Sequence, residues 1–310
     1  YITPPIEDVK ARSEKHAAHL NFKVAKYDLL YDFGENARIL GEVNSIISEI
    51  SNDSNLKITE FSITGYASPE GNYNSNMKLS ENRAYTFVNY LRDKYGIDPA
   101  MLKTTWEGED WYGLREMVDS SFIADKNEII SIIDNEDDIA KRKNELKKLS
   151  NGSTYKKLLK EYYPFLRRNE YSISYIVRPF TVEEAKEIIK TKPQHLSQNE
   201  MFMVANTYSE NSSEFKEIFD IIARYYPDNT IVKANNATIE LEYKNWDAAL
   251  RQLESINENI PEVWNNIAYI YIQKGDYKKA EEYFKKAADA KLDCAVNNIA
   301  EYKKWLDSNP

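Results

Sequence analysis

The sequence has 310 residues, and its length and composition exclude several classes of protein. A chain of this length exceeds the usual size of one domain, so we expect two domains. Hydrophobic residues make up 42% of the chain, but no apolar run approaches the ~18 residues needed to cross a bilayer. The net charge is −9, and the two signs alternate along the chain instead of forming a basic patch. Nucleic acid is therefore not an expected partner.

The cysteine and histidine content argues against a metal site. Cys294 is the single cysteine, which excludes an internal disulfide and any cysteine-based metal site. His16, His19 and His195 are too few and too scattered for a histidine-based one. No glycine-rich phosphate loop or nucleophile elbow is present, and we expect no cofactor. The chain begins with Tyr1 and not with Met, so an export signal could have been removed.

In the first part of the chain we expect a terminal segment, followed by a strand and a helix. Residues 1–18 contain adjacent prolines and lack an apolar period, so we expect a tail or the end of a preceding domain. Residues 22–31 alternate between apolar and polar, as in a half-buried strand. The apolar positions of this strand are Phe22, Val24, Tyr27, Leu29 and Tyr31. An apolar stripe with helical spacing over residues 39–50 predicts the helix that follows.

Further strands and helices are expected up to residue 180. Residues 56–64 predict a second strand, and a second helix is expected to end at Gly96, a typical left-handed cap. A strand near 101–106 precedes charged helical material over about 114–165, and alternation at 171–177 predicts a last strand. This order of strands and helices implies a layered sheet with helices packed against it.

Beyond residue 180 the pattern is helical and repetitive. Phe215, Trp246 and Tyr277 follow one another at intervals of 31 residues. Two further sets keep the same interval: Ile218, Ala249 and Ala280, then Ile222, Leu253 and Phe284. Such a period predicts stacked helical hairpins, because one hairpin alone cannot bury its apolar face. We therefore expect an all-α domain over residues 181–310.

The last copy, residues 261–287, resembles the tetratricopeptide repeat. Its large and small packing residues stand where that family places them: Trp264, Ile267, Ala268, Tyr271, Gly275, Ala280, Phe284 and Ala287. The resemblance implies a surface that binds a protein partner, formed by the first helix of each hairpin. On that helix, Asn265 and Tyr269 are the candidate contacts, with ordinary exposed polar positions as the alternative.

A second resemblance covers roughly residues 20–180. Residues 63–71 read Ile-Thr-Gly-Tyr-Ala-Ser-Pro-Glu-Gly, and residues 76–84 read Asn-Met-Lys-Leu-Ser-Glu-Asn-Arg-Ala. Together with Gly108-Glu109 and Arg167-Arg168, this order resembles the OmpA-like peptidoglycan-binding domain, interrupted by an insertion of helices. The resemblance implies an α/β fold, a mixed sheet with helices packed on it, over residues 19–180, followed by the helical repeats.

The OmpA-like resemblance also implies a binding site. In that family an Asp after the second strand and the helix Arg hold the diaminopimelate of a peptidoglycan stem peptide, which suits a zwitterionic amino-acid end. The corresponding Arg is Arg83, and Asn76 lies two helical turns before it on the same face, about 10 Å away along the axis. Ser68 occupies the Asp position, so the anion for the ligand's ammonium is missing unless Glu70 supplies it.

We expect a non-enzymatic module in the periplasm of a Gram-negative bacterium, associated with the outer membrane or cell wall. It would dock on peptidoglycan and hold an envelope protein through its repeats. One alternative is a pure assembly scaffold with a degenerate pocket. Another is a cell-wall hydrolase that uses Glu109 and Asp110, since paired carboxylates flanked by Trp106 and Trp111 suit glycosidic cleavage. A loop at the rim of the binding groove is the simpler interpretation of these carboxylates.

Overall fold

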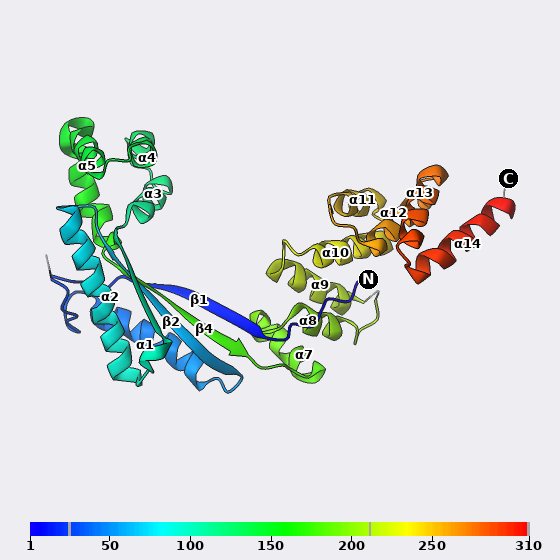
Figure 1. Cartoon of the computed structure of the whole chain (residues 1–310), viewed down its shortest axis with the longest axis horizontal. Coiled ribbons are helices and arrows are strands. Elements are labelled where there is room, and N and C mark those ends of the chain that lie inside the picture. The colour runs from blue at the N-terminus through cyan, green and yellow to red at the C-terminus, as the bar shows by residue number, and fades with distance from the viewer. Residues whose placement is uncertain (24–25, 211, 309–310) are drawn as a thin grey trace. The chain divides into compact units, whose positions relative to one another are not determined.

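The computed structural model describes residues 1–23, 26–210 and 212–308, and it divides into two compact units. One unit is Ala11–Arg178, and the other combines Tyr1–Lys10 with Pro179–Pro310. The chain therefore passes between the units twice, after Lys10 and after Arg178. Figure 1 traces both units, and each is described by itself below.

The Ala11–Arg178 unit is built on a mixed four-stranded sheet in the order β1-β4-β2-β3. The strands are β1 (Lys10–Ala18), β2 (Leu56–Ala67), β3 (Leu102–Glu109) and β4 (Asn169–Val177). Strand β2 runs parallel to β3 and antiparallel to β4. Helices α1 (Asn36–Asn52) and α2 (Tyr73–Tyr95) pack on the sheet (Figure 1). The predicted α/β class is confirmed.

The first strand lies earlier than the sequence predicted, and this is a correction. Residues 10–18, expected within a tail, form β1 beside β4. Most of its side chains are polar, and only those of Lys10 and Ala18 are buried, so it carries no apolar alternation. Contacts with β4 hold it instead: the Tyr175 hydroxyl donates to Glu14 at 2.5 Å, and the His16 ring stacks on Tyr171.

The expected strand at 22–31 is absent from residues 22–23 and 26–31, and Val24 lies outside the described residues. The described residues there form a loop in which Phe22 is buried. Asn36, fully buried at the start of α1, fixes this loop by accepting from the Asn21 N–H at 2.6 Å. Its amide donates to the carbonyls of Asn21 and Leu30 at 2.9 and 2.8 Å. Apolar residues of a loop, of which Tyr27 and Tyr31 are exposed, thus imitated the alternation of a strand.

The remaining predicted elements of this unit are confirmed. Helix α1 buries its predicted stripe, and α2 ends at Gly96, whose φ of 63° is left-handed and whose N–H donates to the Arg92 carbonyl. The predicted insertion is helical and has a core of its own. Its helices are α3 (Trp111–Asp119), α4 (Lys126–Asn135), α5 (Ile139–Lys148) and α6 (Ser153–Lys157), followed by short turns up to Leu166.

The unit containing Pro179–Pro310 is helical, as predicted. Its α-helices are α7 (Val182–Thr191), α8 (Gln198–Ala205), α9 (Ser213–Tyr225), α10 (Thr230–Glu242), α11 (Trp246–Glu254), α12 (Pro261–Gln273), α13 (Tyr277–Asp289) and α14 (Asp293–Ser308). The repeated positions lie on α9, α11 and α13, the second helix of each hairpin. Ala249 and Ala280 are fully buried, so these small residues let neighbouring helices approach closely.

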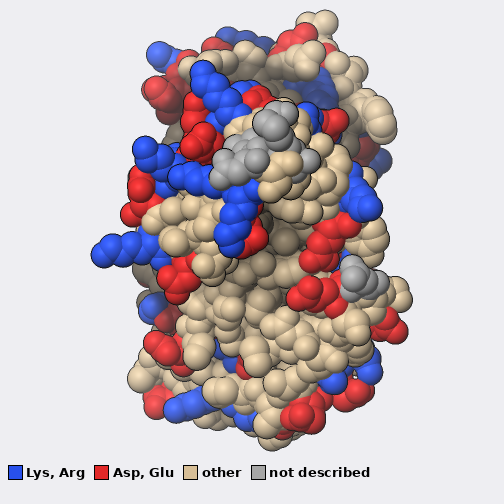
Figure 2. Space-filling view, turned by 90° about the vertical axis from the view of Figure 1, so that its right-hand side faces the viewer, with Lys and Arg blue, Asp and Glu red and all other residues tan. Residues whose placement is uncertain are grey.

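The surface carries both signs of charge, and Figure 2 shows acidic and basic side chains interspersed on the face drawn there. Within the described ranges, no helix is both long and apolar enough to span a bilayer. The same part of the chain holds no group of three or more His, Cys, Asp or Glu residues arranged to bind a metal ion.

Candidate functional site

The candidate site lies where β2 ends and α2 begins, and the structure brings the four expected residues together there. Ser68, Asn76 and Arg83 are buried, while Glu70 is half-buried in the loop between them. The Ser68 hydroxyl donates to the Glu70 carboxylate at 3.2 Å, and the Asn76 amide donates to the Glu70 carbonyl at 2.5 Å. Helix α2 therefore fixes the loop through its first turns.

Arg167, which the sequence did not assign to the site, holds the Glu70 carboxylate. The Arg167 guanidinium donates to Glu70 Oε1 at 2.5 Å and to the Ser68 hydroxyl at 3.2 Å. The Glu70 carboxylate therefore lies beside Ser68, the residue that stands where the resemblance expects an Asp. The signal for Arg167 was present, since it belongs to the Arg167-Arg168 pair before β4, but the pair indicated no role.

The buried guanidinium of Arg83 has few hydrogen-bond partners. It is 2% exposed, its Nε has no hydrogen-bond partner among the described residues, and its Nη1 reaches only the Tyr66 carbonyl at 3.5 Å. Burial, together with a smaller effect of the Arg167 charge and against the opposing effect of Glu70, lowers the pKa of Arg83 to about 10. The Arg83 guanidinium thus remains charged at neutral pH with donors to spare. The Phe22 ring covers it, with its centroid 5.0 Å from Cζ.

Glu109 joins the insertion to the site. Its side chain is fully buried and accepts from the Asn76 amide at 2.7 Å, from the Trp111 indole at 3.1 Å and from the Lys143 ammonium. Lys143, on α5, also donates to the Gly71 carbonyl at 3.0 Å. No sequence motif marked Lys143, because it comes from a charged helix outside the OmpA-like pattern.

Asp110 likewise has partners within the protein. It caps α3 by accepting from the Gly113 N–H at 2.8 Å, and it pairs with Arg168 at 2.8 Å. A glycosidase needs one carboxyl group to give or take a proton and another to face the sugar. Glu109 and Asp110 each accept hydrogen bonds from several groups within the protein, which favours a structural role for both.

A pocket of about 540 Å³ opens next to this cluster. Glu70 and Asn76 line it, whereas Ser68 and Arg83 do not. The other lining residues are Tyr27, Gly71, Asn72, Ser75, Lys78, Leu79 and Asn82. A second pocket, of about 460 Å³, shares Gly71 and Asn72 and is completed by helix α5 of the insertion. The loop at 70–72 therefore separates two adjoining hollows.

The candidate partner contacts lie on α12. The Asn265 amide oxygen accepts from Asn298 of α14 at 2.9 Å, so Asn265 already has a partner in the fold. Tyr269 is 42% exposed, and its ring meets the edge of Trp246 at 6.2 Å. Tyr269 also lines a pocket of about 280 Å³ together with Tyr302 and Trp305. Tyr269 is thus the more accessible of the two.

Comparison with known proteins agrees with both resemblances. Residues 33–127 match the OmpA family, and residues 261–294 match the tetratricopeptide repeat. A segment of 63 residues is 36% identical to "Outer membrane protein 41" of Porphyromonas gingivalis (strain ATCC BAA-308 / W83). This match spans 20% of the chain and 15% of that relative. An OmpA domain and a tetratricopeptide repeat are therefore present, which confirms the two resemblances.

Proposed function

We propose that the chain is a non-enzymatic module of the Gram-negative cell envelope with two binding functions. Its OmpA domain docks on peptidoglycan by holding the diaminopimelate of a stem peptide, and its helical repeats hold an envelope protein. The OmpA domain and the outer membrane relative support an envelope location, and we assign the module to the periplasm, next to the outer membrane or the cell wall.

One observation carries the peptidoglycan assignment: Arg167 pairs with the Glu70 carboxylate, and the buried guanidinium of Arg83 lies near both charges. This cluster has a net positive charge, and Arg83 Nε lacks an acceptor among the described residues. A ligand carboxylate would satisfy those donors through a charge-assisted bond. Glu70, on the wall of the pocket, would accept from the ligand's ammonium group. Diaminopimelate carries both groups at one end.

The covering ring of Phe22 sets a condition on this binding. Because Arg83 is 2% exposed, a ligand carboxylate reaches its guanidinium only when the Phe22 side chain turns aside. The ring then loses a cation–π contact, and the ligand's charge replaces it. Peptidoglycan binding should therefore be weaker than in a domain with an open arginine.

Sedimentation with purified peptidoglycan tests the proposal. The chain should be retained by peptidoglycan that contains diaminopimelate, and excess free diaminopimelate should release it. Peptidoglycan with lysine in the stem is the matched control, since lysine lacks the second carboxylate that Arg83 would bind. Equal retention by both types would contradict diaminopimelate recognition.

A pure assembly scaffold is the second candidate. The ion pair of Glu70 with Arg167 and the Phe22 cover over Arg83 favour it, because both interactions occupy the site within the chain. This function predicts no retention on either type of peptidoglycan, with binding confined to protein partners of the repeats.

A further inference from the structure

The first residues of the chain lie against the helical repeats as an extended peptide. The Ile2 N–H donates to the Asn235 amide oxygen at 2.6 Å, and the Asn235 amide nitrogen donates to the Ile2 carbonyl at 2.8 Å. Asn199 donates in the same way to the Pro4 carbonyl at 2.8 Å. Asn199 lies on α8 and Asn235 on α10, the first helices of two successive hairpins. Figure 1 shows this N-terminal stretch beside α8 and α9.

The side chains of this segment enter two different hydrophobic clusters. The Tyr1 ring meets Phe215 at 5.3 Å and Phe219 at 5.4 Å, both on α9. Ile2 packs against the cluster formed by α10, α11 and α12. Successive residues of an extended chain point to opposite sides, which places Tyr1 and Ile2 on either side of the seam between two hairpins. Pro4 is buried as well.

We infer that this seam is a peptide-binding site and that the chain's own residues 1–4 fill it in cis. The ligand class is an extended segment with an aromatic residue, then an aliphatic one, and a proline two positions later. Asn235 and Asn199 read the backbone of the segment, and the two clusters select its side chains. A partner's segment of this class would bind by displacing residues 1–4.

The hydrogen-bond pattern distinguishes a ligand from ordinary core packing. A buried carboxamide that bonds both the N–H and the carbonyl of one residue replaces the pairing that a neighbouring strand would give. Asn235 is 2% exposed with residues 1–4 in place, so its carboxamide has exchanged water for the two hydrogen bonds to Ile2. An extended peptide of a partner could make the same two bonds when residues 1–4 leave.

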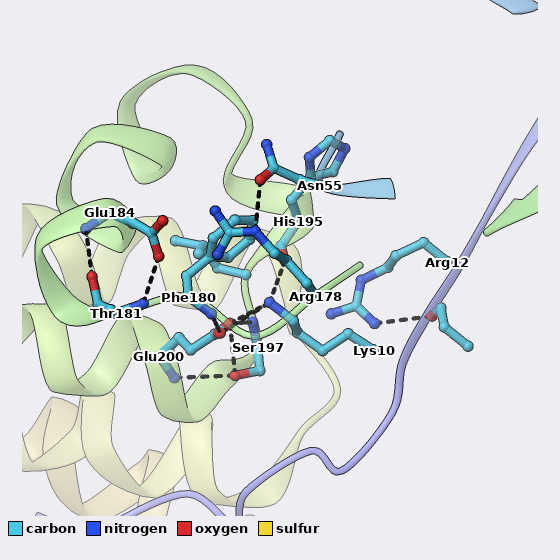
Figure 3. Close-up of polar contacts among 12 residues, drawn as sticks. Lys10, Arg12, Asn55, Arg178, Phe180, Thr181, Glu184, His195, Ser197 and Glu200 are labelled. Atoms are coloured by element: carbon cyan, nitrogen blue, oxygen red, sulfur yellow. Dashed lines mark hydrogen bonds and ion pairs between the residues drawn. The ribbon is translucent and has the colours of Figure 1, made fainter. Parts of the chain in front are cut away.

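The segment can leave without unfolding the rest of the unit. Residues 5, 6, 8 and 9 are exposed, and Ile6 is 78% exposed. Further along the chain, the Lys10 ammonium pairs with Glu200 at 2.9 Å and donates to the His195 carbonyl at 3.2 Å (Figure 3). Residues 1–4 can therefore detach while Lys10 stays in place.

This inference deepens the partner-binding half of the proposed function and rests on it, but it does not depend on peptidoglycan. The test uses the full chain and a fluorescent peptide, acetyl-Tyr-Ile-Thr-Pro-Pro-Ile-amide. The variant Tyr1→Ala/Ile2→Ala weakens the cis segment and leaves the site intact. Ile6→Ala is the matched control, because it changes an exposed aliphatic residue of the same segment.

Fluorescence anisotropy should show that Tyr1→Ala/Ile2→Ala binds the peptide at least about tenfold more tightly than the wild type, since a site filled in cis is rarely free. Ile6→Ala should match the wild type. Adding Asn235→Asp to the double variant should abolish binding, because the amide donor to the Ile2 carbonyl is lost. A peptide with alanine at its first two positions should not bind.

Hydrogen exchange on the wild type gives a measurement that needs no variant. Saturating peptide should speed amide exchange in residues 1–9 and protect α8 and α10. Equal peptide binding by the wild type and the double variant, or no binding by either with unchanged exchange, would overturn the inference. Peptidoglycan sedimentation of the same proteins should be unchanged, so failure of the cell-wall assignment would be seen separately.

Discussion

The ammonium group of Lys143, on the inserted helix α5, binds the carboxylate of Glu109 at the end of β3. Both side chains are at least nine-tenths buried, and Lys143 also donates to the Gly71 carbonyl at 3.0 Å. This ion pair attaches the insertion to the loop that lines the candidate pocket. The insertion therefore acts as a structural support of the site.

Replacing Lys143 with methionine should destabilise the Ala11–Arg178 unit. The change leaves the buried Glu109 carboxylate without its cation, which typically costs about 3–5 kcal/mol. Chemical denaturation followed by circular dichroism measures the loss. Lys141→Met is the control, since Lys141 is exposed on the same helix and should change stability little. Equal stability of the two variants would show that the pair contributes nothing.

The sequence predicted the helices and inner strands of this unit because they carry apolar periods. It missed β1, whose polar side chains lack such a period and whose place depends on β4. It misplaced a strand at 22–31, since these apolar residues belong to a loop that Asn36 fixes and in which Phe22 is buried. Short-range patterns contain no information about such long-range pairing.

The candidate site, too, was predicted from the sequence only in part. Asn76 and Arg83 could be placed from their shared helix face, and Glu70 from its distance to Ser68 along the loop. Arg167 lies just before β4, 97 residues beyond Glu70, and no local pattern predicts that pairing. The cover of Arg83 by Phe22 likewise depends on the loop before α1.

Gly65 should not tolerate a side chain. A Cβ there would overlap the Ser80 carbonyl oxygen and lie 2.9 Å from the Ala84 Cβ, so α2 would have to move off β2. We expect Gly65→Ala to lower the free energy of unfolding by roughly 1–3 kcal/mol. Gly41→Ala is a control of opposite sign, because Gly41 lies in α1 with open space around it and alanine should stabilise that helix by about 0.5–1 kcal/mol. Paired thermal melts decide whether the two shifts have opposite signs.

Tyr171 should contribute to alkaline unfolding. Burial, with smaller effects of Tyr95 and Glu42, raises the pKa of Tyr171 to about 12. The folded state therefore favours the neutral phenol, and this contribution is complete below about pH 10 and is lost as the pH rises to about 12. Tyr171→Phe should reduce the fall in unfolding free energy between about pH 9 and pH 11 by about 1 kcal/mol. Tyr112→Phe, at a position 72% exposed, should leave that fall unchanged. If both variants follow the wild type, Tyr171 has no such role.

Arg83→Gln should weaken retention on peptidoglycan that contains diaminopimelate. The loss of one charge-assisted contact corresponds to about 1.5–3 kcal/mol, so the dissociation constant should rise at least about tenfold. Arg92→Gln removes a guanidinium from the exposed side of the same helix and should bind normally. Melting curves of both variants establish that the fold is kept. Unchanged retention by a folded Arg83→Gln protein would exclude Arg83 from the binding site.

The resemblance expects an Asp at the position of Ser68, and a double-mutant cycle tests whether Glu70 replaces it. Glu70 already lies 3.2 Å from the Ser68 hydroxyl and pairs with Arg167, so we propose that it supplies the anion that the resemblance assigns to position 68. We therefore expect Glu70→Gln to weaken diaminopimelate binding by about tenfold, or ~1.4 kcal/mol.

Ser68→Asp alone should give no gain, because it brings two carboxylates together and repulsion raises the pKa of one of them. In the Glu70→Gln background the same change should restore affinity, since a single carboxylate then faces Arg167 again. Calorimetric titration of the wild type and the three variants measures the cycle. A gain from Ser68→Asp in the wild type would instead mean that Glu70 does not fill the role, and equal affinities throughout would show that this cluster does not bind the ligand's ammonium group.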